Sequence, residues 1–183
     1  MKKSLGVKTY IFPQPVLIIA TYDENGQPNA MNAAWGGIAN NDEIMICLGT
    51  HKTTANLAIN QACTIAMGDA NHVAACDYVG IVSANNTPDK FAKTGWTTTK
   101  SNLVNAPIIN ELPLTLECTL IKIVDDEKYF FRIENVIADE NILTDGKIDL
   151  NKFQPITYDP AGHGYYTLGA KVGQAFTDGR KIK

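Results

Sequence analysis

The runs and alternation of apolar positions along the chain favour β-strands joined by short turns. Val16 to Tyr22 is an unbroken run of β-branched, aliphatic and aromatic residues, and such runs are typical of strands. Asp23 to Gly26 follows as a hairpin turn in which the glycine can take a positive φ. The chain then returns through Gln27 to Ala34, so these residues are predicted to form one antiparallel hairpin.

Two further strands are expected before the middle of the chain. Gly36-Gly37 and Asn40 to Asp42 break the second strand and introduce a third one, Glu43 to Leu48. Cys63 to Met67 is again a short apolar run between polar residues, which is the pattern of a buried strand. The first fifty residues are therefore predicted to form an antiparallel meander.

Short helices are predicted between the strands, and each begins at a residue type that commonly caps a helix. Leu57 and Ile59 would form the apolar side of the first helix. Asp69 is the expected N-cap of the second helix, and Gly80 is expected to end it. The three predicted helices run from Thr53 or Thr54 to Gln61, from Ala70 to Tyr78, and from Thr87-Pro88-Asp89 to Gly95.

The second half of the chain returns to β character. Leu114 to Ile123 interleaves polar and apolar residues, Asp125 to Lys128 is a turn, and Tyr129 to Ala138 pairs back as a long hairpin. Trp96 to Asn105 is polar and without periodicity, so it is predicted to be an excursion loop. About six or seven strands in hairpin order, without a βαβ rhythm, favour a closed or split antiparallel barrel over a doubly wound sheet.

Length and charge narrow the possible classes of protein. A chain of 183 residues is most simply one domain, residues 1–183. A formal net charge of -3 with signs interspersed gives no footprint for nucleic acid. The longest apolar run, Val16 to Ala20, is far shorter than the about 20 residues needed to cross a bilayer. We expect a soluble, cytoplasmic protein with no membrane and no nucleic-acid partner.

The cysteines and histidines do not suggest a metal centre. The cysteines are widely spaced and never form a CxxC pair, so buried free thiols are expected. The histidines do not add ligands at the spacing that zinc sites use, so no metal is expected. The residues concerned are Cys47, Cys63, Cys76 and Cys118, with His51, His72 and His163.

The stretch from Asn29 to Asn56 carries the candidate chemistry. Asn29 to Trp35 consists mostly of small side chains, so its backbone could approach a flat ligand closely. Gly49 to Thr54 runs from a strand end into a helix start and offers free N–H groups, hydroxyls and the Lys52 cation, which suit a phosphate. We interpret the whole stretch as a flavin cradle.

Two features of this stretch also have ordinary structural interpretations. Trp35 is compatible with a core aromatic residue, and His51-Lys52 with a solvated loop capped by Thr53. The small residues before Trp35 and the Gly36-Gly37 pair after it favour the ligand interpretation. The position of His51-Lys52 between a strand end and a helix start favours the phosphate interpretation.

An ordered set of short motifs extends through nearly the whole chain. It consists of Pro15-Val16, Thr21 to Asn29, Met31 to Trp35, Thr50 to Thr53 before Asn56-Leu57, Asp77 to Ser83, Lys90-Phe91 and Tyr165 to Gly169. As a set, these motifs resemble the flavin reductase-like family with an FMN-binding split barrel, and within it the flavoredoxin branch. The resemblance implies a mainly β fold, an antiparallel Greek-key split β-barrel with short inserted helices.

The resemblance also implies a homodimer that binds one FMN per subunit near the interface. Asn32, Ala33, Ala34 and Trp35 would line the isoalloxazine ring, Thr50, His51, Lys52 and Thr53 would hold the phosphate and ribityl chain, and Ser83 and Lys90 would approach the same cofactor. Many relatives have an arginine where this chain has Lys52. Lysine keeps the charge but lacks the bidentate fork of arginine.

The predicted function is that of an FMN-dependent oxidoreductase, which moves electrons from NAD(P)H through FMN to a small-molecule or protein redox partner. No residue is assigned a catalytic role, because hydride and electron transfer belong to the cofactor. The chain has no GxGxxG unit, so NAD(P)H would stack over the flavin only transiently, with Trp35 and the loop from Trp96 to Asn105 limiting access.

Two other interpretations remain open at the level of sequence. The first is a flavoredoxin-type electron-transfer protein that keeps FMN but does not turn over NAD(P)H. The second is a split barrel that stores flavin or binds haem without turnover, with His51, His72 or His163 as the iron ligand.

Overall fold

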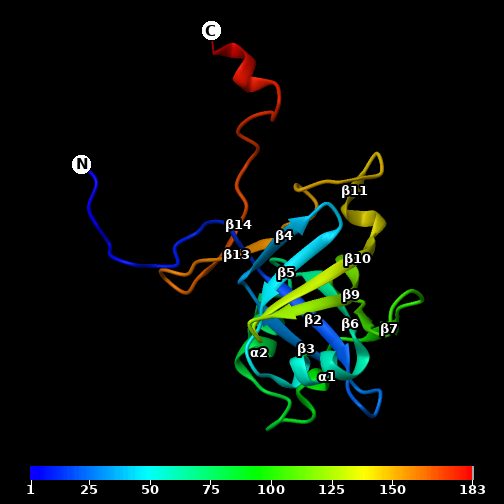
Figure 1. Ribbon diagram of the computed structural model, residues 1–183. Helices are drawn as coiled ribbons and strands as arrows, with labels where there is room; N and C mark the ends of the chain where they lie inside the picture. The colour runs from blue at the N-terminus through cyan, green and yellow to red at the C-terminus, as the bar shows by residue number, and fades with distance from the viewer. Residues whose placement is uncertain (183) are drawn as a thin grey trace.

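The computed structural model describes residues 1–182 and is built around one curled, antiparallel sheet of seven strands (Figure 1). Its strand order is β3-β2-β6-β9-β10-β5-β4. The strands are β2 (Leu17–Tyr22), β3 (Pro28–Ala33), β4 (Gly36–Asn40), β5 (Glu43–Cys47), β6 (Ala62–Met67), β9 (Leu114–Val124) and β10 (Lys128–Ala138). This arrangement confirms the predicted mainly β, antiparallel barrel fold.

Short helices and three small sheets surround the main sheet. The helices are α1 (Lys52–Asn60), α2 (Val73–Ile81) and α3 (Lys90–Lys93), with 3-10 turns η1 (Glu140–Ile142) and η2 (Asp178–Lys181). The small sheets pair β1 (Gln14–Pro15) with β13 (Ile156–Tyr158) and β14 (Tyr165–Thr167), β7 (Thr98–Lys100) with β8 (Pro107–Ile109), and β11 (Leu143–Thr144) with β12 (Lys147–Ile148).

Strand β2 is buried on both of its faces. Its neighbours are β3 and β6, with Ile19 opposite Met31 on one side and Ile65 on the other. One face, with Ile18 and Ala20, belongs to the core cluster that the helices cover, and the other face, with Leu17 and Ile19, belongs to a second cluster around Phe131. Burial on both faces explains why this segment is a continuous apolar run and not an alternating one.

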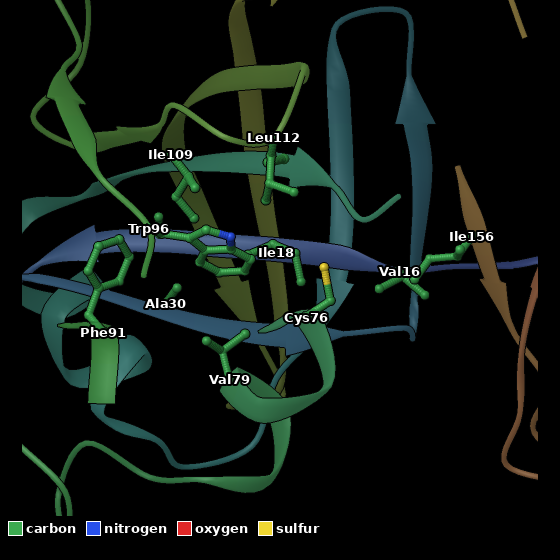
Figure 2. Packing of buried hydrophobic residues seen from close by; sticks show 12 residues of the cluster. Val16, Ile18, Ala30, Cys76, Val79, Phe91, Trp96, Ile109, Leu112 and Ile156 are labelled. Atoms are coloured by element: carbon green, nitrogen blue, oxygen red, sulfur yellow. The ribbon is translucent and has the colours of Figure 1, made fainter. Parts of the chain in front are cut away.

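Figure 2 shows how the helices cover the core cluster that contains Ile18. Cys76 and Val79 of α2 and Phe91 of α3 reach toward Ile18 of β2, and the Trp96 ring lies among them. The Phe91 and Trp96 ring centroids are 6.3 Å apart in a tilted arrangement. Helices α2 and α3 are thereby held against the sheet by apolar burial.

Two predictions about local structure were wrong at the edge of the sheet and in the excursion loop. Gly36 to Asn40 is a strand, β4, and not a break, because Gly36 fits against Leu17 and Ile46 where a Cβ would lie 3.0 Å from each side chain. Trp96 is only 6% exposed, and the following loop is bound to β9, since buried Ser101 donates a hydrogen bond to Glu117 at 2.5 Å.

The predicted caps of the helices also needed correction. Helix α1 begins after His51, whose N–H donates to Thr54 Oγ1 at 2.9 Å, so the threonine acts from inside the first turn. Asp69 Oδ1 accepts the N–H groups of Asn71 and His72 in the turn that precedes α2. Of the two residues assigned to the apolar side of α1, Leu57 is buried but Ile59 is 58% exposed.

Candidate functional site

An open cleft of about 480 Å³ lies where the end of β3 meets the end of β5, the second half of α2, and the β13–β14 pair. Small and apolar groups form much of its surface, and aromatic rings stand at one end. The lining residues are Met31, Asn32, Ala33, Ala34, Trp35, Cys47, Leu48, Gly49, His51, Asp77, Gly80, Ile81, Glu127, Tyr158 and Tyr165.

A second cavity of about 230 Å³ adjoins this cleft. The two share Met31, Asn32, His51, Gly80 and Ile81, so they are adjacent and have part of one wall in common. The cavity differs from the cleft in carrying two lysines and several hydroxyl or amide groups. Its other residues are Asn29, Lys52, Thr53, Val79, Val82, Ser83, Ala84 and Lys90.

The structure brings together nearly all the residues singled out from the sequence. Asn32 to Trp35 and His51 line the cleft, and Lys52, Thr53, Ser83 and Lys90 line the adjoining cavity. Thr50 is exposed and lines neither space. The loop from Trp96 to Asn105, which was expected to limit access, contributes no lining residue to either. Its Trp96 and Thr98 line a separate pocket, which also contacts Asn29 and Lys52.

The floor of the cleft depends on a close approach between α2 and β3. A Cβ on Gly80 would lie 3.1 Å from the Asn32 Cβ, so the helix can approach this closely because glycine has no side chain. The Asn32 amide donates a hydrogen bond to the Cys76 carbonyl at 3.0 Å. Gly80 therefore serves packing within the helix and does not end it, which corrects the sequence interpretation.

Three aromatic rings form one wall of the cleft. The Tyr158 centroid lies 6.1 Å from that of Trp35 and 6.0 Å from that of Tyr165. Trp35 is 45% exposed, so it lies at the rim and is not a core residue. The Tyr165 hydroxyl donates to Asp77 Oδ1 at 2.9 Å. Burial, and then this bond to Asp77, raise the pKa of Tyr165 above its ordinary range.

The cavity end of the site is rich in cations. Lys52 Nζ lies 2.8 Å from Glu24 Oε2 of the first hairpin turn. Lys90 is only 4% exposed, and its Nζ donates to the Val79 carbonyl at 2.8 Å. Burial lowers the pKa of Lys90 from its ordinary value of 10.5 to about 8.

Lys90 is a buried cation whose charge is not balanced by a carboxylate. The ion pairs found within residues 1–182 do not include it. A buried charge without a partner is costly, and an anion in the cavity would offset that cost. The hydroxyl of buried Thr53, which accepts a hydrogen bond from the Asn29 amide at 2.8 Å, lies in the same cavity at the start of α1. Hydroxyls, a helix N-terminus and lysine suit a phosphate.

The structure also places residues at the site that sequence reasoning did not select. Tyr158 comes from β13, and Glu127 comes from the turn between β9 and β10. Cys47 lines the cleft and is half-buried, whereas the other three cysteines are buried, and all four are free. No local pattern marks these residues, because they reach the cleft through strand pairing across long separations.

The three histidines lie in three different surroundings. His51 is at the cleft, the His72 ring bonds Asp69 at 2.8 Å, and the His163 ring bonds the Tyr158 hydroxyl at 2.6 Å. Among residues 1–182 there is no group of three or more His, Cys, Asp or Glu side chains placed to hold a metal ion. The same residues contain no helix that is long and apolar enough to cross a membrane.

Comparison with known proteins identifies the family. A model of the flavin reductase like domain matches residues 9–166. The chain belongs to the flavin reductase-like family. A search of curated proteins found no match.

Solved structures agree with this assignment. A flavoredoxin of Desulfovibrio vulgaris (Miyazaki F) is 36% identical, with a TM-score of 0.94 over 98% of this chain and 100% of that one. A flavoredoxin from Methanosarcina acetivorans is 24% identical, with a TM-score of 0.88 over 100% of both chains. An FMN-binding domain of a flavin reductase-like enzyme from Shewanella baltica OS155 is 17% identical, with a TM-score of 0.79 over 88% of this chain and 89% of that one. The split-barrel prediction is thereby confirmed.

The buried charge of Lys90 makes a prediction about the ligand-free protein. Because its pKa is lowered to about 8 in the folded state, the unfolded chain binds more protons than the folded chain between pH 8 and 10.5, and stability from this group rises with pH across that window. The free energy of unfolding of the Lys90→Met variant should therefore exceed that of the wild type by the largest amount at pH 7, and this difference should shrink toward pH 10.5. Urea unfolding at pH 7, 9 and 10 measures this difference.

The matched control is Lys93→Met, since Lys93 lies in the same helix but its side chain is 52% exposed. This variant should not show a gain in free energy of unfolding at pH 7 that then shrinks as the pH rises. A Lys90→Met advantage that is independent of pH would mean that Lys90 is not titrating in this window.

Proposed function

We propose that this protein is an FMN-dependent oxidoreductase, and that its FMN lies with the ring in the cleft and the phosphate in the adjoining cavity. The observation that carries the proposal is the shared wall of the two adjacent spaces, with aromatic and small residues at one end and buried Lys90 at the other. When bound, FMN supplies hydride and electron transfer. The whole chain, as one domain in the cytoplasm, would serve this single site.

The cleft residues would orient the ring and keep water from part of it. Asn32 to Ala34 present a surface of small side chains that a flat ring can approach closely, and the Asn32 amide is fixed by its bond to the Cys76 carbonyl. Trp35 and Tyr158 would cover the ring from the rim. Their rings pack on a flat partner at little entropic cost, since each has two rotatable side-chain angles.

The cavity residues would hold the phosphate and ribityl chain. Lys52 and Lys90 supply positive charge, Thr53 and Ser83 supply hydroxyls, and the N-terminus of α1 supplies backbone N–H groups. A phosphate dianion beside Lys90 would raise the lowered pKa of that lysine, so FMN binding is coupled to proton uptake above about pH 8. Thr50 lies outside both spaces and would contribute only through its place in the loop.

The electron donor is proposed to be NAD(P)H, stacked transiently over the exposed side of the flavin. The rim is open enough for this, because Trp35 is 45% exposed and Ile81 is 75% exposed. The alternative is a flavoredoxin-type carrier that receives electrons without turning over NAD(P)H. It is favoured by the 36% identity to a flavoredoxin across the whole of that chain.

A spectrum of the purified protein tests the proposed function and separates it from the alternative. Bands near about 370 and 450 nm that bleach anaerobically on adding NADH or NADPH are expected, because the donor reduces bound flavin. Bleaching with dithionite alone would favour the carrier. The absence of flavin bands after reconstitution with FMN would overturn the proposal.

The phosphate assignment predicts the effect of a single charge. Lys52→Ala should weaken FMN binding by about 1 to 3 kcal/mol, because it removes a charged hydrogen bond. Fluorescence titration of the apoprotein with FMN measures the loss. Lys93→Ala is the control, since it removes the same charge from an exposed position outside the cavity. Equal affinities for the two variants would remove Lys52 from the site.

A homodimer is proposed as the working assembly, and the two ends of the chain support it. Both run away from the barrel in Figure 1 and expose apolar side chains. A second copy would bury this surface, as obligate interfaces do. The exposed apolar residues of the two ends are Leu5, Val7, Ile11 and Phe12, with Leu168, Val172, Phe176 and Ile182.

Light scattering tests this assembly directly. The full chain loaded with FMN should have twice the monomer mass, and a variant lacking residues 1–12 should shift toward the monomer because it loses part of the buried apolar surface. An FMN-loaded full chain that scatters as a monomer would contradict the dimer.

A further inference from the structure

The cleft wall contains a tyrosine whose hydroxyl is connected to solvent through a histidine. Tyr158 lines the cleft, and its hydroxyl lies 2.6 Å from Nδ1 of His163, which is exposed on the outer side of the pair. The two rings are 6.2 Å apart and tilted by 42°. A group that can exchange protons with water therefore reaches the cleft through one hydrogen bond.

The backbone at His163 takes a left-handed conformation, which five other non-glycine residues among residues 1–182 also adopt. Its φ is 59°, in the left-handed region, where residues other than glycine are uncommon although histidine is enriched. The turn is closed by two backbone bonds, from His163 N–H to the Asp159 carbonyl at 2.9 Å and from Asp159 N–H to the Gly164 carbonyl at 2.8 Å. Strained residues of this kind gather at functional sites.

The other tyrosine of the wall is not free for this task. The Tyr165 hydroxyl already donates its proton to Asp77 Oδ1 at 2.9 Å, and the Asn32 amide lies 3.5 Å from the same oxygen. The titratable groups around His163 are Tyr158 of β13, Asp159 of the turn, and Tyr165 of β14 with Asp77 of α2 behind it. Of the two tyrosines, only Tyr158 has a partner that can both give and accept a proton.

We propose that Tyr158 and His163 deliver a proton into the cleft, and that the acceptor is a small organic molecule with a conjugated carbonyl group. This inference rests on the proposed flavin function. A carrier that passes single electrons to a protein needs no proton donor in its cleft. Reduction of a carbon–carbon double bond next to a carbonyl needs a hydride and a proton together, and an aromatic-walled cleft with a few polar groups suits such a molecule.

The atoms and electrons of this step balance. FMN held in the cleft would supply, in its reduced form, a hydride and with it both electrons to the double-bond carbon farther from the carbonyl, and NAD(P)H would be the reductant that restores it. The Tyr158 hydroxyl gives its proton to the carbon beside the carbonyl. Nδ1–H of the His163 imidazolium then restores the Tyr158 proton, and the neutral imidazole regains a proton from water. Tyr158 is the catalytic residue, and His163 acts through it.

The pair itself can be tested without any cofactor. Nitrogen-15 NMR of histidine-labelled apoprotein, with His163 assigned by the His163→Gln variant, should show at high pH that Nδ1 accepts a hydrogen bond and Nε2 carries the proton. Tyr158→Phe should change this tautomer ratio, because phenylalanine has no hydroxyl to bond Nδ1. Tyr166→Phe is the control, because Tyr166 is exposed and lines no part of the cleft. An identical His163 signal in the wild type and Tyr158→Phe would mean that the two side chains are not hydrogen-bonded, and would overturn the proposal.

Proton delivery is then tested by comparing two electron acceptors. Protein loaded with FMN and reduced by dithionite is mixed anaerobically with cinnamaldehyde, which needs a proton, or with ferricyanide, which takes single electrons and no proton. The reoxidation rate with cinnamaldehyde, divided by the rate with ferricyanide, should fall at least tenfold in Tyr158→Phe and in His163→Gln, since general acids contribute about 10²- to 10⁴-fold to a rate.

An unchanged ratio in both variants, or a wild type that reduces ferricyanide but not cinnamaldehyde, would overturn the proton-delivery role and leave the flavin function standing. Tyr166→Phe should keep the wild-type ratio. Titration with FMN comes first, because a chain that binds no FMN overturns the proposed function itself. The two failures are therefore distinguishable.

Discussion

Helix α2 can approach strand β3 closely only because Gly80 has no side chain, and the whole site is arranged around that contact. A Cβ at this position would lie 3.1 Å from the Asn32 Cβ. The contact places the Asn32 amide under the Cys76 carbonyl and aligns the second half of α2 with the small residues of β3. A wider separation would leave the floor of the cleft without a defined surface, since packed interiors do not deform continuously.

The two ends of the site are held in different ways, and this difference matters for function. Rings and small apolar groups form the cleft end, where burial and stacking are the available interactions. At the other end, a lysine that is only 4% exposed donates to one carbonyl, Val79, within the described residues. Burying that charge lowers the stability of the fold, and an anionic ligand would offset this loss. Stability and ligand binding would thus be linked through Lys90.

The aromatic wall of the cleft bears on whether the protein is an electron carrier or a reductase. Membership in the flavin reductase-like family and similarity to flavoredoxins are compatible with both, because each needs only a bound flavin. The Tyr158–His163 pair is the feature that would be useful in only one of these two roles. It would serve an acceptor that takes protons and would be idle in an exchange of single electrons.

The sequence by itself determined the strand pattern, the mainly β fold and most of the residues that gather at the site. Local signals were sufficient for the strands, the turns and the stretch from Asn29 to Asn56, since apolar runs, turn residues and a strand end followed by a helix start are each encoded within a few positions. Ser83 and Lys90 were assigned through the family resemblance. The roles of glycines were harder to predict. Gly36 and Gly80 look like breaks in the sequence, but the structure uses them for close packing inside β4 and α2.

Only the tertiary structure decided which distant groups complete the site. Tyr158 reaches the cleft because β13 pairs with β1 and β14, and Trp96 joins the core where an access loop was expected. Lys90 became informative through its burial and its missing carboxylate partner within residues 1–182, neither of which a sequence pattern encodes. The physical reason is the same in each case. Burial, charge balance and contact depend on pairing between segments far apart in the chain, and local sequence carries no record of that pairing.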